Sequence, residues 1–241
     1  MRLIRSVRAT ALFILLGLAA PATALPRPDR ELVRARLGEN AHPTFTRDGA
    51  RLTSLTRLSV PTTGDSPRLR AAQFVKTHRD LLALDEHDSV EAIDVKALPR
   101  LAKHAAAPSQ VVRLRQTHRG LPVEGRDIVV TLDGQDRVTS VKSDLGPLDV
   151  PVPRREISAD DAIRAAYDTF AISAHGAPQK VILANGSAGR IAWRVPVSVL
   201  PLAGFATVWI DAEDGRVLRE EKVGHAHGPT ELPRHHLEET P

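Results

Sequence analysis

The strongest constraint on the fold is the alternation of apolar and polar residues within residues 111–142. Val112 and Leu114 alternate with arginines, and a second apolar segment with the same period follows. Period-two alternation places one face of an extended strand against a core and leaves the other face in water. Gly120 and Gly134 supply turn residues between the extended segments. The sequence therefore predicts three strands joined by tight turns, which is an antiparallel meander.

A motif lies within this meander. Its four positions are Gln116, Gly120, Pro122 and Val123. Together with the apolar strand and the glycine turn that follow, they resemble the fungalysin/thermolysin propeptide domain. The resemblance implies a domain that usually precedes a zinc endopeptidase. We expect the four residues to hold the fold, because glycine and proline have turn roles and Gln116 can bond across the meander as a buried side chain.

Two helices and a strand pair are expected upstream of the meander. A short helix is predicted for residues 29–37, ending at Gly38, and two strands are predicted within residues 44–60. Ser66 is expected to cap a second helix that has proline at its first position. His78 falls on the apolar face of that helix, and we interpret it as a half-buried histidine rather than a ligand.

A second module is predicted after the meander. Ser158 and Asp161 fit a capping box at the start of a helix whose apolar face includes Tyr167. Strands are expected at residues 180–184, 191–200, 206–211 and 216–221. The turn that contains Asp211 and Gly215 resembles the end of a PepSY domain, a module found after the propeptide domain in the same precursors. We expect both of these residues to be structural.

The predicted fold class is α+β. Two small modules each pack a curved antiparallel sheet on a helix, as in cystatin-like propeptide domains. The expected organisation is a signal peptide at 1–24, an N-terminal segment at 25–43, a propeptide-like domain at 44–145, a linker at 146–155, a PepSY-like domain at 156–222 and a disordered His- and Pro-rich tail at 223–241.

The first residues have the pattern of a secretory signal. Three arginines precede a short apolar run, and Ala22-Thr23-Ala24 fits a cleavage site. We expect cleavage after Ala24 and a secreted or periplasmic bacterial protein that no longer contacts the membrane. The chain has no cysteine. Core burial rather than disulfide bonds must therefore stabilise the mature protein, and thiolate metal sites are excluded.

The charge balance does not predict a nucleic-acid partner. The first 24 residues carry three of the 33 Lys and Arg residues and none of the 29 Asp and Glu residues, which leaves a side-chain net charge of +1. Aromatic residues make up 3% of the chain, which is too few for stacking on bases. The chain therefore has neither the excess of positive charge nor the aromatic side chains that nucleic-acid binding requires.

Catalytic motifs are missing from the sequence. It contains no H-E-x-x-H zinc motif, no G-x-S-x-G elbow and no glycine motif for phosphates or dinucleotides. We therefore predict neither enzyme activity nor a cofactor. The weak candidates for a metal site are four tail histidines, His225, His227, His235 and His236. A solvated tail is the preferred interpretation, because such a segment lacks the partners that orient metal ligands.

The combined interpretation is a secreted, non-catalytic, propeptide-like protein. The resemblance implies that it binds a thermolysin-type zinc metalloprotease in trans, as an inhibitor, a folding chaperone or both. Two alternatives remain open: the chain is the N-terminal propeptide remnant of a truncated metallopeptidase precursor, or it is an extracellular module that binds a peptide or a cell-wall ligand. An in-frame H-E-x-x-H downstream would indicate the precursor, and ligand binding by residues 156–222 alone would indicate the binding module.

Overall fold

The computed structural model describes residues 29–99, 108–170, 173–174, 176–199 and 204–225. The predicted signal peptide and the tail beyond residue 225 lie outside the described residues. In the first half of the chain the elements are α1 (Arg30–Leu37), β1 (His42–Phe45), β2 (Leu52–Thr56), β3 (Val60–Pro61), α2 (Pro67–Thr77), β4 (Asp88–Ala97), β5 (Gln110–His118), β6 (Leu121–Leu132) and β7 (Arg137–Ser143). In the second half they are α3 (Ala159–Phe170), β8 (Ser173–Ala174), β9 (Gln179–Asn185), β10 (Ala188–Val199), β11 (Gly204–Asp211) and β12 (Val217–His225).

The predicted meander is confirmed as strands β5, β6 and β7, which pair antiparallel in sequence order. Val112 and Leu114 are fully buried. The turn between β5 and β6 places Arg119 and Gly120 at φ of 51° and 79°. Two successive residues with positive φ are typical of a type I′ turn, whose twist matches that of the strands it joins.

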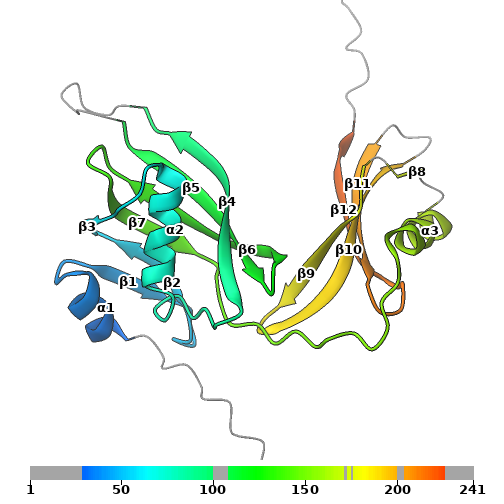
Figure 1. Ribbon diagram of the computed structural model, residues 1–241, viewed down its shortest axis with the longest axis horizontal. Coiled ribbons are helices and arrows are strands. Elements are labelled where there is room, and N and C mark those ends of the chain that lie inside the picture. Colours follow the sequence, from blue (N-terminus) through cyan, green and yellow to red (C-terminus); the bar gives the residue numbers. More distant parts are fainter. Residues whose placement is uncertain (1–28, 100–107, 171–172, 175, 200–203, 226–241) are drawn as a thin grey trace, which may run out of the picture.

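The core of the first half lies between α2 and the sheet (Figure 1). Ser66 caps α2 as predicted, with its Oγ accepting a hydrogen bond from the amide of Leu69 at 3.4 Å. Phe74 and Val75 of α2 belong to the same buried cluster as the inward-facing residues of β5 and β6. The apolar face of the helix therefore covers the apolar face of the meander, and burial of both faces stabilises the fold. None of the described helices is long and apolar enough to cross a membrane.

Helix α3 packs on one face of the second half of the sheet (Figure 1). The predicted capping box is present: Ser158 Oγ accepts from the amide of Asp161, and Asp161 Oδ2 accepts from the amide of Ser158, both at 3.1 Å. Hydrogen bonds from Ser158, then from Arg164, lower the pKa of Asp161 to about 2. Two reciprocal bonds thus fix the start of this helix.

The prediction that Tyr167 lies on the buried face of this helix is wrong, since its side chain is 59% exposed. The contact with the sheet is made instead by Ala162 and Ala166, which are four residues apart and buried. These small side chains let the helix approach the sheet closely. Tyr167 is displaced by about 100° around the helix from Ala166 and therefore faces water.

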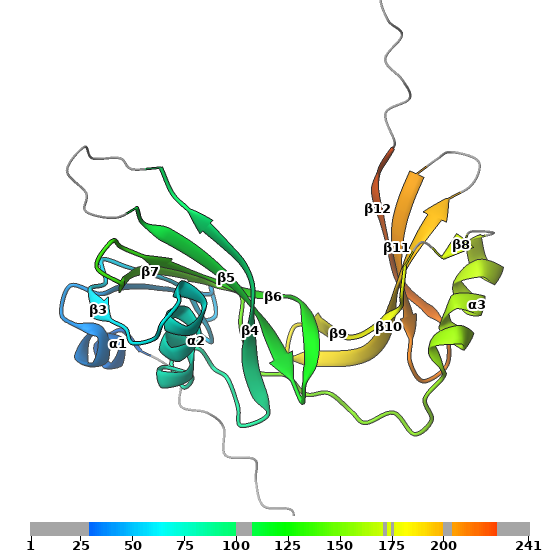
Figure 2. The ribbon, with the colours of Figure 1, turned by 45° about the horizontal axis from the view of Figure 1, so that its top comes forward.

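The expected pair of separate cystatin-like modules is not confirmed, because strand pairing joins the two halves. Strand β6 pairs parallel with β9 through Val123 with Ile182 and Glu124 with Leu183. The result is one large open sheet of 12 strands, with the central order β1-β2-β7-β6-β9-β10-β11-β12. Figure 2 shows the start of β6 beside β9 at the middle of the molecule. The fold is thus mixed α+β with a continuous sheet and few helices.

The segment predicted as a linker, residues 146–155, is extended and packs along this junction. Leu148 and Val150 are buried in a small cluster with Val123 and Ile182. Gly189 on β10 permits the approach, because a Cβ atom there would lie 2.7 Å from Cγ2 of Val150. The junction therefore has an apolar core of its own.

His78 ends helix α2 and is half-buried, with its ring centroid 4.7 Å from that of Phe74. Burial lowers the pKa of His78 below its ordinary value of 6.5, an effect opposed by Asp80 and reinforced by Arg36. The folded chain then binds fewer protons than the unfolded chain just below pH 6.5. The stability contributed by neutral His78 is complete above that pH and is lost as the pH falls below it.

We therefore expect the melting temperature of the wild type to fall more between pH 7.5 and pH 5.5 than that of His78→Gln. Thermal unfolding followed by circular dichroism at each pH measures the difference. Because both proteins carry the same other titratable groups, the comparison isolates His78. Equal pH dependence in the two proteins would contradict the expectation.

Candidate functional site

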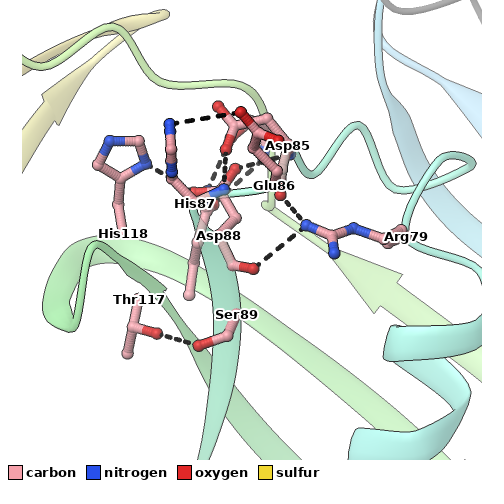
Figure 3. Close-up of polar contacts among 10 residues, drawn as sticks. Arg79, Asp85, Glu86, His87, Asp88, Ser89, Thr117 and His118 are labelled. Carbon is pink, nitrogen blue, oxygen red and sulfur yellow. Dashed lines mark hydrogen bonds and ion pairs between the residues drawn. The ribbon is translucent and has the colours of Figure 1, made fainter.

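Buried polar side chains gather where β4 begins and β5 ends (Figure 3). In this part of the molecule they are Asp88, Gln116, Thr117 and His118. The backbone there is irregular, because the pairing of β5 with β6 shifts register between Arg115 and Thr117. A register shift turns side chains that would otherwise alternate, and it brings Gln116, Thr117 and His118 all into buried positions.

The carboxylate of Asp88 is the centre of this polar cluster. Its Oδ1 accepts a hydrogen bond from Nε2 of Gln116 at 2.9 Å and lies 3.0 Å from Nδ1 of His118. Its Oδ2 accepts from the backbone amide of Asp85 at 3.0 Å. Asp88 is only 6% exposed. Three donors are thus arranged around a buried acid, as the burial of a charged group requires.

Gln116 connects this acid to the segment that leaves the meander. Its Nε2 also donates to the carbonyl oxygen of Gly146 at 2.9 Å, and its Oε1 accepts from the amide of Gly146 at 3.3 Å. The side chain, predicted to be buried, is fully inaccessible to solvent. Gln116 therefore ties β4, β5 and the start of the segment 146–155 together at one point.

The loop before β4 carries further charges beside the cluster. Arg79 donates to the backbone carbonyl oxygen of Asp85 and, at 3.4 Å, to that of Asp88. The ring of His87 meets that of His118 edge-on, with centroids 6.0 Å apart, and Nε2 of His87 lies 3.7 Å from the carboxylate of its neighbour Glu86. The run Asp85 to Asp88 and the end of β5 thus form one polar surface. Its innermost side chains, Asp88 and His118, are buried.

The Asp88–His118 pair does not form a hydrolytic triad with any described residue. A triad needs a hydroxyl or thiol hydrogen-bonded to the histidine. The hydroxyl of Ser89 bonds instead to Oγ1 of Thr117 at 2.6 Å. The geometry therefore favours structural or ligand-binding roles for the cluster over nucleophilic catalysis.

A second buried polar contact crosses the junction between the halves. Arg126, on β6, donates to the carbonyl oxygens of Asp144, at 2.9 Å, and of Gly186 in the β9–β10 turn. Burial and the nearby guanidinium of Arg51 lower the pKa of Arg126. Sequence reasoning missed this residue, because alternation alone does not indicate that an arginine will be buried.

The other predicted positions are not brought into the polar cluster. Pro122 and Val123 lie on β6, and Val123 is in the junction core. Asp211 ends β11, where its Oδ1 accepts from the amide of Glu213 at 2.8 Å. The carbonyl oxygen of Asp211 accepts from the amide of Gly215, whose φ is 77°. These contacts give each of the four a local role in a strand or turn.

Of the four weak metal candidates in the tail, only His225 is among the described residues. His225 is the last residue of β12, where its backbone pairs with Gly204. The remaining three histidines, His227, His235 and His236, lie outside the described residues.

One protein-family model matches a part of the chain. The fungalysin/thermolysin propeptide motif matches residues 109–145. This stretch is β5, β6 and β7, so the predicted propeptide motif is confirmed for the meander. No curated protein matches the chain.

Three solved structures show limited likeness. The C-terminal domain of YpeB from Bacillus megaterium is 14% identical, with 77% of each chain covered and a TM-score of 0.39. YpmB from Bacillus subtilis is 13% identical, covering 55% of this chain and 84% of that one at a TM-score of 0.25. A Clostridium difficile 630 protein classed as a lipoprotein is 13% identical, covering 68% and 93% at a TM-score of 0.24. The assignment of residues 156–222 to the PepSY class stays a prediction.

Proposed function

We propose that this protein is a secreted, non-catalytic, propeptide-like protein that binds a thermolysin-type zinc metalloprotease carried on another chain. The binding inhibits the protease, assists its folding, or does both. The observation that carries the proposal is the propeptide motif at residues 109–145. Propeptides with this motif belong to zinc endopeptidases, and binding to the enzyme is the property that a propeptide module can retain without catalytic residues of its own.

Strand β4 offers a surface for such a partner. It is hydrogen-bonded to β5 on one side, and no described strand pairs with its other edge. Ile93 on this strand and Leu98 just beyond it are large apolar side chains with 36% and 38% of their surface exposed. An extended segment of a partner can add to a free edge through backbone hydrogen bonds, while side chains such as these supply specificity.

The test uses the chain beginning at residue 25, titrated against a thermolysin-type protease. We expect stoichiometric inhibition of peptide cleavage, or an increased yield when the denatured protease is refolded in its presence. A serine protease serves as the control, since it lacks the zinc-protease fold and is expected to show neither effect. The absence of both effects on thermolysin-type enzymes from the same organism would contradict the proposal.

Replacing Ile93 and Leu98 together by aspartate is expected to weaken inhibition about tenfold or more, because charges would replace apolar contacts at the docking edge. Tyr167→Asp is the matched control, since this exposed apolar residue lies on α3, away from β4. Far-UV circular dichroism verifies that both variants fold. Equal inhibition by the two variants would exclude the β4 edge as the docking surface.

A groove on the second half favours a different candidate function, an extracellular module that binds a peptide or a small ligand. It has a volume of about 650 Å³ and is lined in part by Leu183, Arg190, Leu218 and Arg219. Beneath it, Trp209 packs against Leu183 and Leu218, and its indole N–H has no hydrogen-bond partner in the described part of the chain. Ligand binding that quenches tryptophan fluorescence while leaving the protease unaffected would favour this alternative.

A further inference from the structure

We propose that Asp85, Asp88 and His118 form a binding site for one divalent transition-metal ion, with Zn²⁺ as the best chemical fit. The site is independent of the protease interaction proposed above. It lies at the start of β4 and the end of β5, whereas that interaction uses Ile93 and Leu98.

The positions of the ligand atoms support this site. One atom from each of the three residues lies within 4.8 Å of the other two. Nδ1 of His118 and Oδ1 of Asp88 are already 3.0 Å apart (Figure 3). A tetrahedral zinc ion with bonds near 2.1 Å separates its ligand atoms by roughly 3.4 Å. The Asp85 side chain is half-buried, and its Oδ1 accepts a hydrogen bond from the amide of His87 at 2.7 Å. Its carboxylate keeps further lone pairs that can bind an ion.

The two other ligands are held in place before an ion arrives. Asp88 and His118 are 6% and 3% exposed. Gln116 Nε2 and the amide of Asp85 fix the Asp88 carboxylate by hydrogen bonds of 2.9 and 3.0 Å. Hydrogen bonds of this kind orient metal-binding side chains and raise their affinity, because the ion does not have to order them.

His118 can bind the ion through Nδ1 while its proton moves to Nε2. Nδ1 of His118 lies 3.0 Å from a carboxylate oxygen of Asp88. An ionised carboxylate only accepts, so the tautomer that suits this contact carries its proton on Nδ1, and an ion at Nδ1 takes the place of this proton. The neutral imidazole then carries its one proton on Nε2. No described residue forms a hydrogen bond with Nε2, so this nitrogen can donate to water without disturbing the fold.

The local charge also favours a divalent cation. Asp85, Glu86 and Asp88 place three carboxylates within four residues. Arg79 contacts this loop, but it donates to the backbone carbonyl oxygens of Asp85 and Asp88 rather than to their carboxylates. The guanidinium of Arg126 also lies near enough to Asp88 for an electrostatic interaction. Three carboxylates therefore face two guanidinium groups, Arg79 and Arg126, and the burial of Asp88 strengthens its attraction for a cation.

The donor set selects the class of metal. One imidazole nitrogen with two carboxylates suits zinc and its first-row neighbours, whereas calcium takes six to eight oxygen ligands. Three protein ligands also leave one position of a tetrahedral zinc ion open, which is the pattern of sites that bind water or a further ligand.

The experiment titrates Zn²⁺ into the chain beginning at residue 25, with the four tail histidines replaced by alanine to remove their competing binding. Isothermal titration calorimetry is expected to show one saturable site. A saturating Zn²⁺ concentration is expected to raise the melting temperature by about 5 °C, and the same concentration of Ca²⁺ to leave it unchanged.

Single substitutions in this background locate the site. Asp85→Asn is expected to weaken zinc binding roughly tenfold or more. Glu91→Gln removes the same charge from an exposed position on β4 and is expected to change the affinity by less than about twofold. His118→Asn tests a second ligand and is also expected to weaken zinc binding. If His118→Asn does not fold, the affinity of Asp85→Asn alone decides whether the site is correct.

Two results would overturn the proposal. One is the lack of a saturable zinc site once the tail histidines are replaced. The other is an affinity that Asp85→Asn and Glu91→Gln reduce equally, because a diffuse acidic surface would then explain the binding.

Discussion

Replacing Gln116 by leucine is expected to lower the free energy of unfolding by about 3 kcal/mol, because buried polar groups lose their partners. The amide of Gln116 supplies Asp88 with a hydrogen bond of 2.9 Å, and it bonds both the carbonyl oxygen and the amide of Gly146. Leucine fills a similar volume without making any of these bonds. The buried carboxylate and the backbone of Gly146 are then left partly unsatisfied.

Chemical denaturation at pH 7 measures this loss. Gln110→Leu is the matched control, since Gln110 begins the same strand, is half-buried and forms no side-chain hydrogen bond with the described residues. We expect the control to change stability by less than about 0.5 kcal/mol. A Gln116→Leu protein as stable as its control would show that the polar cluster adds nothing to the fold.

The second large effect is expected at the junction. Arg126→Ala should lower the free energy of unfolding by about 2–3 kcal/mol and weaken the coupling between the two halves. The guanidinium is buried and bonds the carbonyl oxygens of Asp144 and Gly186, one on each side of the junction. Alanine leaves both oxygens without this donor and leaves a void where the side chain packed.

Two optical probes can report the coupling separately. Trp193 and Trp209 both lie in the second half, so tryptophan fluorescence follows that half, whereas far-UV circular dichroism follows the whole chain. We expect the two denaturation curves to coincide in the wild type and to separate in Arg126→Ala. Arg137→Ala is the control, because it removes an exposed hydrogen bond to Ser59. Coincident curves with an unchanged midpoint in Arg126→Ala would show that the junction is held without this residue.

Several local features followed from the sequence because short-range stereochemistry sets them. The alternation of Val112 and Leu114 indicated which face of β5 is buried, and both side chains are inaccessible to solvent. The capping residues Ser66 and Ser158 marked the starts of α2 and α3, where each bonds an amide three residues ahead. The propeptide motif is equally local, since it consists of three successive strands, β5, β6 and β7, joined by tight turns.

The candidate metal site could be anticipated only in part. The run Asp85-Glu86-His87-Asp88 is visible as a dense group of potential ligands. Nothing in its spacing indicates that His118, 30 residues after Asp88, completes it. The interpretation of the tail histidines rested on composition alone, because composition is the only signal that an aperiodic segment offers.

The sequence by itself determined the meander, the helix caps and the turn between β5 and β6, each of which depends on residues within a few positions of one another. Only the tertiary structure decided that β6 pairs with β9, that Asp88 meets Gln116 and His118, and that Tyr167 faces water. The physical reason is that these contacts depend on how whole strands and helices pack against one another. A register shift in β5 and a close helix contact through alanines set those approaches, and no periodicity in the chain encodes either one.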